Sequence, residues 1–378
     1  MAQKLKFISA ILFSLLFLSQ KSFCQSNEPA AVKKDSVPVQ KKDSAKIMLS
    51  GYVDGYYAYF TDSLPGNNYQ KFSSVSPRSN SIGLNIAVLQ AKYASEKVRG
   101  VVALHFGDIP RSIWATSGYL FAIQEANAGI RLSKKVWLDG GFFRKHIGAE
   151  GLLPKENICS SVAVTTYMEP HYEAGFKLNY NPSDKFALNL FVLNGYNIYE
   201  DNNNQKSFGM LATYAVNDNF NIGYSNYMGD DSPNSDTIAP VRFFNNFFLN
   251  YQTHKIKMQI GGDYVFQKTD DPNDPALVMS CLGSLRYQLT KKTGIYIRGE
   301  YFSDAQGFLS GTYTDMNGQA TGLTISGVTA GIEYKPTDNA YLRLEGRQLN
   351  AEKVNLFYWK GNVTDVRNEM MVHLGVSF

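Results

Sequence analysis

Apolar side chains occupy every second position over most of this chain. In the segment 82–88, for example, Ile82, Leu84 and Ile86 alternate with small or polar residues. This period of two is typical of β-strands that have one apolar face and one polar or small face. Sixteen segments follow the pattern and are predicted to be strands: 48–60, 82–88, 98–106, 126–132, 136–142, 172–180, 186–192, 207–215, 220–228, 242–253, 256–266, 277–289, 294–302, 323–334, 340–349 and 369–378.

The connectors between the predicted strands alternate strictly in length. Every second one, such as 134–135 or 181–185, has about two to five residues, and the others have roughly nine to nearly thirty. An up-and-down antiparallel sheet gives this alternation when all tight turns lie at one end and all loops at the other, as in outer-membrane barrels. A set of β-sandwiches, the soluble alternative, would mix short and long connections at both ends.

Strand length and count then define the predicted fold class. Each strand and its connector use about 21 residues, enough for a tilted strand of about ten residues to cross the hydrocarbon layer. Because every strand edge inside a bilayer must be paired, the first and last strands are expected to close the sheet. We therefore predict an all-β, transmembrane, up-and-down antiparallel β-barrel of about 16 strands. It should have short periplasmic turns, long extracellular loops and a water-filled lumen.

The N-terminus indicates export. Lysines precede an apolar run from Phe7 to Leu18, and small residues at Ser22 and Cys24 suit cleavage before Gln25, which is the layout of a signal peptide. Acylation of Cys24, as in a lipoprotein, is the alternative. We predict a signal peptide over 1–24, a disordered periplasmic linker over 25–46 and a barrel over 47–378. No later stretch of 18 residues is apolar, so no transmembrane helix is expected.

Composition and charge exclude several function classes. The formal charge of +4 belongs to residues 1–46, so the predicted barrel is nearly neutral and offers no basic footprint for nucleic acid. The five histidines are scattered, and neither an HExxH nor a GxSxG motif occurs, so no enzyme, metal site or cofactor is predicted. Cys159 and Cys281 lie in different kinds of segment, and a disulfide between them is not expected. A TonB-dependent transporter would need a much longer chain.

Nearly all mid-strand charges fall on the face opposite the apolar one. Charges facing lipid would cost about 2 to 4 kcal/mol each at mid-membrane, so this face is predicted to line the pore. The predicted pore-lining residues are Asp54, Arg99, His105, Arg131, Asp139, Glu173, Lys177, Lys257, Asp263, Arg286, Arg298, Glu300, Glu333, Arg343, Glu345 and Arg347. They would set a transverse field for solutes or, alternatively, stiffen the wall through salt bridges.

The third long loop, about 144–170, is the candidate constriction. Its first residues, Arg144, Lys145 and His146 with Glu150, are charged, and in general porins a loop at this position folds into the pore. An ordinary surface loop is the alternative. The second long loop, 107–124, is expected to contain a short helix.

Some aromatic residues break the alternation. Phe244 and Phe248, like Tyr52 and Tyr56, fall on the lumen face. Such rings would either stack on sugars or support an in-folded loop.

Several segments resemble a known family. ALHFGDIP (103–110), EANAGIRL (125–132), DGGFFRKHIGAEG (139–151), EPHYEAGFKLNY (169–180) and ALNLFVLNGYN (187–197) with DNNNQKSFG (201–209) are similar to the OmpL-like outer-membrane β-barrel porins of Bacteroidota. The terminal Phe378 resembles the aromatic C-terminus that the barrel-assembly machinery recognises. The resemblance implies a porin and brings no catalytic or ligand residues with it.

The function predicted from these observations is an outer-membrane porin for passive diffusion of small hydrophilic solutes. A non-conducting barrel that serves as scaffold or adhesin is the alternative. The expected partners are outer-membrane lipid, these solutes and the barrel-assembly machinery, and porins of this size are often homotrimers.

Overall fold

The computed structural model describes residues 45–62, 69–114, 118–232, 240–269 and 274–378. The predicted signal peptide, and the linker up to residue 44, lie outside the described residues. The first strand starts at Lys46, one position before the predicted start of the barrel.

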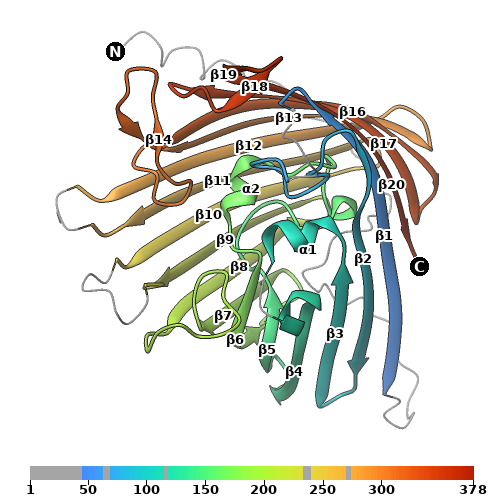
Figure 1. The fold of residues 1–378 in the computed structure, drawn as a ribbon. Coiled ribbons are helices and arrows are strands. Elements are labelled where there is room, and N and C mark those ends of the chain that lie inside the picture. The colour runs from blue at the N-terminus through green and yellow to red at the C-terminus, as the bar shows by residue number, and fades with distance from the viewer. Residues whose placement is uncertain (1–44, 63–68, 115–117, 233–239, 270–273) are drawn as a thin grey trace.

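Sixteen antiparallel strands form one closed barrel, as predicted (Figure 1). Each pairs with its neighbours in chain order, and β1 pairs with β20 to close the sheet. The strands are β1 (Lys46–Phe60), β2 (Ser81–Ala94), β3 (Val98–Phe106), β4 (Ile123–Ser133), β5 (Val136–Arg144), β6 (Tyr172–Tyr180), β7 (Phe186–Leu193), β8 (Ser207–Asn217), β9 (Phe220–Gly229), β10 (Arg242–Gln252), β11 (Ile256–Gln267), β12 (Ala276–Gln288), β13 (Thr293–Asp304), β16 (Leu323–Thr337), β17 (Ala340–Glu352) and β20 (Val366–Ser377).

The remaining elements belong to the long loops. The second loop contains the short helix α1 (Asp108–Ile113) and the 3-10 turn η1 (Gly118–Ala122), as predicted. The third contains the 3-10 turn η2 (Pro154–Glu156) and the helix α2 (Val164–Met168). Two small hairpins, β14 (Tyr313–Thr314) with β15 (Ala320–Thr321) and β18 (Phe357–Trp359) with β19 (Asn362–Thr364), extend the loops near the C-terminal strands. No helix in the described part of the chain is long and apolar enough to cross a membrane.

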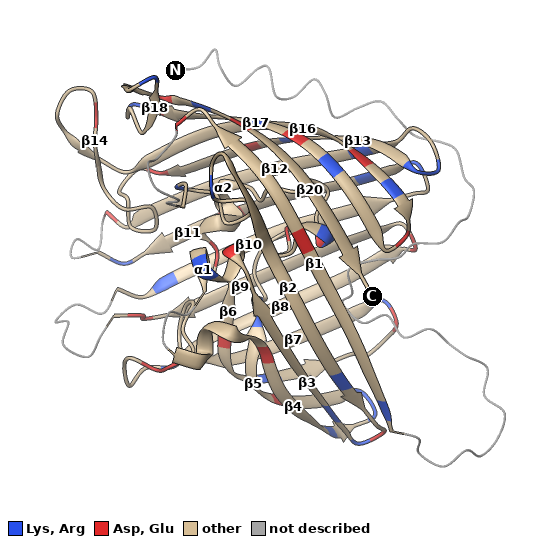
Figure 2. Ribbon diagram, turned by 45° about the vertical axis from the view of Figure 1, so that its right-hand side comes forward, with Lys and Arg blue, Asp and Glu red and all other residues tan. Residues whose placement is uncertain are grey.

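Burial alternates along most strands in the phase that the sequence predicts. In β2 the prediction is wrong beyond residue 85: Ile86 and Val88 are buried in the interior, because a bulge in the β1–β2 pairing reverses the two faces there. In β12, Leu277, Met279 and Cys281 are exposed on the outer face, whereas the residues between them are buried. Because large apolar side chains cover the outer face, the charged positions face the interior, and basic and acidic positions lie side by side on β13, β16 and β17 (Figure 2).

The C-terminal residue fastens the closing seam. The backbone of Phe378 exchanges hydrogen bonds with that of Gly51, with N···O distances of 2.7 and 3.1 Å. The Phe378 ring also lies directly over Gly51, where any Cβ atom would collide with it. The seam between β1 and β20 therefore needs both a glycine and a flat terminal side chain.

Candidate functional site: the lumen and the loop inside it

The third long loop, residues 145–171, lies inside the barrel. Ile147, Ile158 and Val164 are at most 2% exposed and pack among interior side chains of the wall. In Figure 1 the loop and α2 lie within the ring of strands. An ordinary surface loop, the alternative left open by the sequence, does not describe this segment.

Ion pairs fix the root of the loop. Arg144 donates to Glu156 at 2.7 Å, and Lys145 pairs with Glu169. His146 places Nδ1 2.6 Å from a Glu173 oxygen and Nε2 2.7 Å from the backbone carbonyl of Asn226. Both partners are acceptors, so the ring carries both protons.

The pKa of His146 follows from this geometry. Burial by itself would lower it, but the Glu173 carboxylate and the Asn226 carbonyl outweigh burial and raise the pKa above its usual value. The loop root is therefore held by a charged pair.

The middle of the loop is anchored by Glu150 and Arg298. The two side chains meet at 2.9 Å, and both are buried. Arg298 also donates to the Ser161 carbonyl at 2.6 Å, while Glu150 accepts from the Ala163 backbone at 2.7 Å. Because an unpaired buried charge is strongly destabilising, this arrangement specifies one position for the loop.

The far side of the loop is bound by carboxylates of the opposite wall. Glu345 accepts from the backbone nitrogens of Ser160 and Ser161 at 2.7 and 3.0 Å. Glu300 accepts from the Val164 backbone at 2.7 Å. These hydrogen bonds hold the loop across the interior from β5 and β6 to β13 and β17.

Further interior residues complete the anchoring. Arg343 donates to the carbonyl of Pro154 at 2.8 Å, and Asp263 accepts from the hydroxyl of Thr165. Several residues predicted to line the pore thus hold the loop.

A second charged network joins the last strands. Glu333 pairs with Arg286 and Arg343, each at 2.6 Å. Arg347 pairs with Glu300 at 2.9 Å and lies 3.6 Å from Glu369. All six side chains are largely buried, so these ion pairs form a polar seam inside the wall.

Two further members of this polar seam, Arg367 and Glu369, were not predicted to line the interior. Arg367 pairs with Glu369 at 2.6 Å, and both side chains are fully buried. Both have the interior parity of β20, but the strand was predicted to start at residue 369, three residues after its observed start at Val366. The spacing of the charged residues Arg367 and Glu369, two positions apart, could have shown that the strand starts earlier and that both face the interior.

A match to a family model covers residues 46–378, nearly all of the described chain, and the family is described as "putative beta-barrel porin-2, OmpL-like". The chain belongs to this porin family. A comparison with curated proteins gives no match.

Solved structures share the fold of this porin. The outer membrane channel DcaP of Acinetobacter baumannii is 10% identical, with a TM-score of 0.59, and the match covers 88% of this chain and 97% of that one. OmpF of Salmonella typhi, in complex with daunomycin, is 12% identical, with a TM-score of 0.56 and the same coverage. The trimer form of OmpT of Vibrio cholerae is 12% identical, with a TM-score of 0.53, covering 89% of this chain and 100% of that one.

These similarities place the porin in the bacterial outer membrane and support a channel role in general. Within the described residues, no group of three or more His, Cys, Asp or Glu side chains is arranged to hold a metal ion. Cys159 and Cys281 are both free thiols.

Away from the last strands of the porin, Asp139 is the shared partner of basic side chains on β3 and β6. Arg99 donates to both of its oxygens at 2.6 Å, and the Lys177 amine lies 3.7 Å away. Arg131 instead donates to backbone carbonyls at the short-turn end, among them that of Lys134 at 2.9 Å. Lys257 of β11 also faces the interior and is half-buried.

Two predicted residues lie near other loops. Asp54 accepts from Asn85 of β2 at 2.6 Å and lies 3.4 Å from His373, and Asn85 in turn accepts from the Ser76 backbone of the first loop at 2.6 Å. His105 contacts the Phe121 carbonyl of the second loop at 3.1 Å.

Three of the four aromatic residues predicted to face the lumen are covered by protein, whereas the fourth, Phe248, is half-buried. Tyr52 hydrogen-bonds to Tyr341 at 2.6 Å, and Tyr56 donates to Asp108 in α1 at 2.7 Å. Phe244 is buried in the interior apolar cluster. These contacts fit the alternative in which such rings support in-folded loops.

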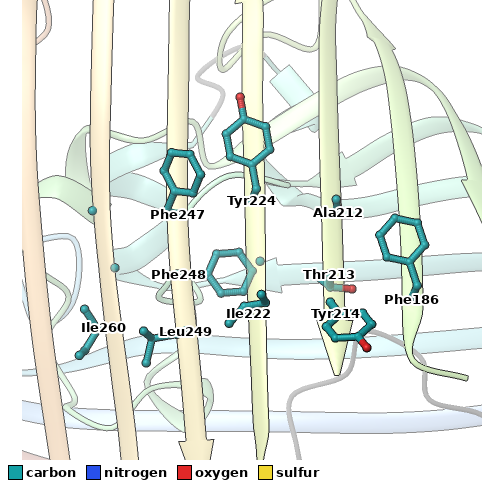
Figure 3. A pocket seen from close by; sticks show the side chains of 13 residues that line it. Phe186, Ala212, Thr213, Tyr214, Ile222, Tyr224, Phe247, Phe248, Leu249 and Ile260 are labelled. Carbon is teal, nitrogen blue, oxygen red and sulfur yellow. The ribbon is translucent and has the colours of Figure 1, made fainter. Parts of the chain in front are cut away.

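The outer wall of the porin carries an apolar hollow of about 630 Å³ (Figure 3). It extends over β7 to β11 and is lined by outward-facing side chains such as Tyr214, Ile222, Phe247, Leu249 and Ile260. Because this hollow opens away from the lumen, it is not part of a path for solutes.

Proposed function

We propose that this protein is a non-enzymatic outer-membrane porin through which small hydrophilic solutes diffuse passively. The main support for this proposal is the position of the loop 145–171. The loop lies inside a closed barrel, where charged and polar side chains of the wall hold it. An inward loop reduces the cross-section of the lumen and surrounds it with fixed charges, which is how a porin restricts solute size.

In this proposal the inward loop supplies the constriction, and its first residues fasten it to the wall. Arg144, Lys145, His146 and Glu150 hold the loop at the height where it enters the lumen. The predicted pore-lining residues have two roles. Arg99, Asp139 and Lys177 face the solute path. Arg298, Glu300 and Glu345 position the loop.

The non-conducting scaffold is the second candidate, and the dense interior packing favours it. Arg298 and Arg367 are among the largest fully buried side chains of the described residues. A barrel filled in this way would present its extracellular loops without conducting.

Purified protein in a planar bilayer separates the two. A porin gives discrete ohmic conductance steps, and swelling of proteoliposomes in sugars of graded size then gives the exclusion limit. A barrel that shifts in mobility on heating, and is therefore folded, but never conducts would contradict the porin and support the scaffold.

We also propose how the protein is exported, assembled and associated. The signal peptide 1–24 is removed, the linker 25–46 remains in the periplasm, and the assembly machinery binds the strand that ends at Phe378. We further propose a homotrimer, in line with the trimer form of the similar OmpT of Vibrio cholerae. The hollow over β7 to β11 supports it, since an apolar recess on the outer wall offers a neighbouring barrel a surface to pack against.

A further inference from the structure

The short-turn half of the lumen, which is the periplasmic half in outer-membrane barrels, contains unevenly exposed charges. Several cationic side chains there reach water, whereas Asp139 and Glu333, the carboxylates that pair with them, are buried. The imbalance occurs in two groups on opposite sides of the barrel.

The first group surrounds Asp139 on β5. Arg99 and Lys177 share this single carboxylate. The side chains of Arg99 and Lys177 are 33% and 25% exposed, and that of Asp139 is 2% exposed. Asp139 thus pairs with two cations, and the other carboxylate near Lys177, that of Glu125, is half-buried.

Lys92 and Lys155 enlarge this group. Both are exposed, Lys92 on the interior face of β2 and Lys155 in η2 of the inward loop, and neither makes a salt bridge within the described residues. The Lys155 amine lies 4.5 Å from the centre of the Tyr52 ring.

The second group lies on β11, β12, β16 and β17. Lys257 stands directly opposite Arg286 in the β11–β12 register, a pairing of like charges that is unfavourable for the sheet alone. Arg286 and Arg343 share the buried carboxylate of Glu333. Lys335 has the same interior parity as Glu333, so this group too has more cations than carboxylates.

The strands between the two groups are neutral. The interior positions nearest the short turns of β7 to β10 include Asn189, Thr213, Asn221 and Asn250. The deeper carboxylates Glu150, Glu300 and Glu345 are occupied by arginines or by backbone nitrogens of the loop. No carboxylate of this set offsets the exposed cations.

We propose that the periplasmic half of the lumen makes this channel selective for anions, so that its preferred solutes are small carboxylates and phosphates. This inference rests on the proposed porin function. A low-dielectric wall with one sign of exposed charge raises the local concentration of the opposite ion.

The test is the reversal potential of the purified full-length protein in a bilayer with a KCl gradient. We expect a reversal potential whose sign shows that chloride permeates better than potassium. This preference should weaken as the total salt concentration rises, because salt screens the fixed charges. The double variant Lys92→Glu/Lys257→Glu should lower the chloride-to-potassium permeability ratio by at least about twofold, since both lysines lack a salt bridge and their loss leaves the fold intact. Lys291→Glu, on the exposed turn between β12 and β13, is the matched control and should leave the ratio near that of the parent.

The outcomes are distinct. Ohmic channels with a zero or potassium-directed reversal potential, or a double variant with an unchanged ratio, would overturn anion selectivity and leave the porin function standing. Absence of conductance from folded protein would overturn both.

Discussion

At the residue scale, the pair of Glu150 and Arg298 shows how this barrel uses charge. Both side chains are withdrawn from water, so each is tolerated because it has a partner of opposite charge. We predict that Glu150→Gln lowers the free energy of unfolding by about 3 kcal/mol, because Arg298 keeps only the more distant Glu300. Urea unfolding of the protein in lipid vesicles, followed by tryptophan fluorescence, measures the change.

Glu352→Gln is the matched control for this prediction. Glu352 is the exposed last residue of β17 and makes no salt bridge within the described residues, so its neutralisation should change stability by less than about 1 kcal/mol. Equal effects of the two substitutions would show that the Glu150 pair contributes nothing beyond net charge.

At the element scale, the inward loop is separable from the wall. The strand ladder is continuous without residues 145–171, so the barrel should survive replacement of 149–166 by a short Gly-Ser linker. We expect the shortened protein to remain heat-modifiable, to conduct more than the parent and to admit larger sugars in swelling assays. These effects follow because the linker removes the segment that fills the lumen.

Shortening the loop around β14 and β15 is the control for the inward loop. This hairpin lies between β13 and β16 at the long-loop end and makes its own two-stranded sheet. Its loss should leave conductance unchanged. If the 149–166 replacement also conducted like the parent, the constriction would have to lie elsewhere.

At the scale of the whole molecule, the outer wall and the lumen serve different partners. The wall exposes apolar side chains to lipid, and its hollow over β7 to β11 suits a neighbouring barrel. A homotrimer should have three times the chain mass in mild detergent and close in three equal conductance steps. A monomeric mass together with single, unrelated steps would be incompatible with the trimer.

The sequence by itself determined the wall of this protein. Period-two alternation and the regular exchange of short and long connectors gave the sixteen strands, their antiparallel order and the face on which Arg298 or Glu345 lies. These features are local, because a strand's two faces and a turn's length depend on neighbouring residues only. Two strands were exceptions. The start of β20 concealed the pairing of Arg367 with Glu369, and a bulge in β2 turned Ile86 to the interior.

Only the tertiary structure decided what fills the lumen. The sequence left open whether residues 144–170 turn inward, because the partners of the loop, such as Glu150 with Arg298, are far apart in the chain. It also left open which charges remain in water, since Asp139 and Arg99 have the same parity but different exposure. Both properties depend on which side chains meet across a closed barrel, and closure brings together residues that no local pattern relates.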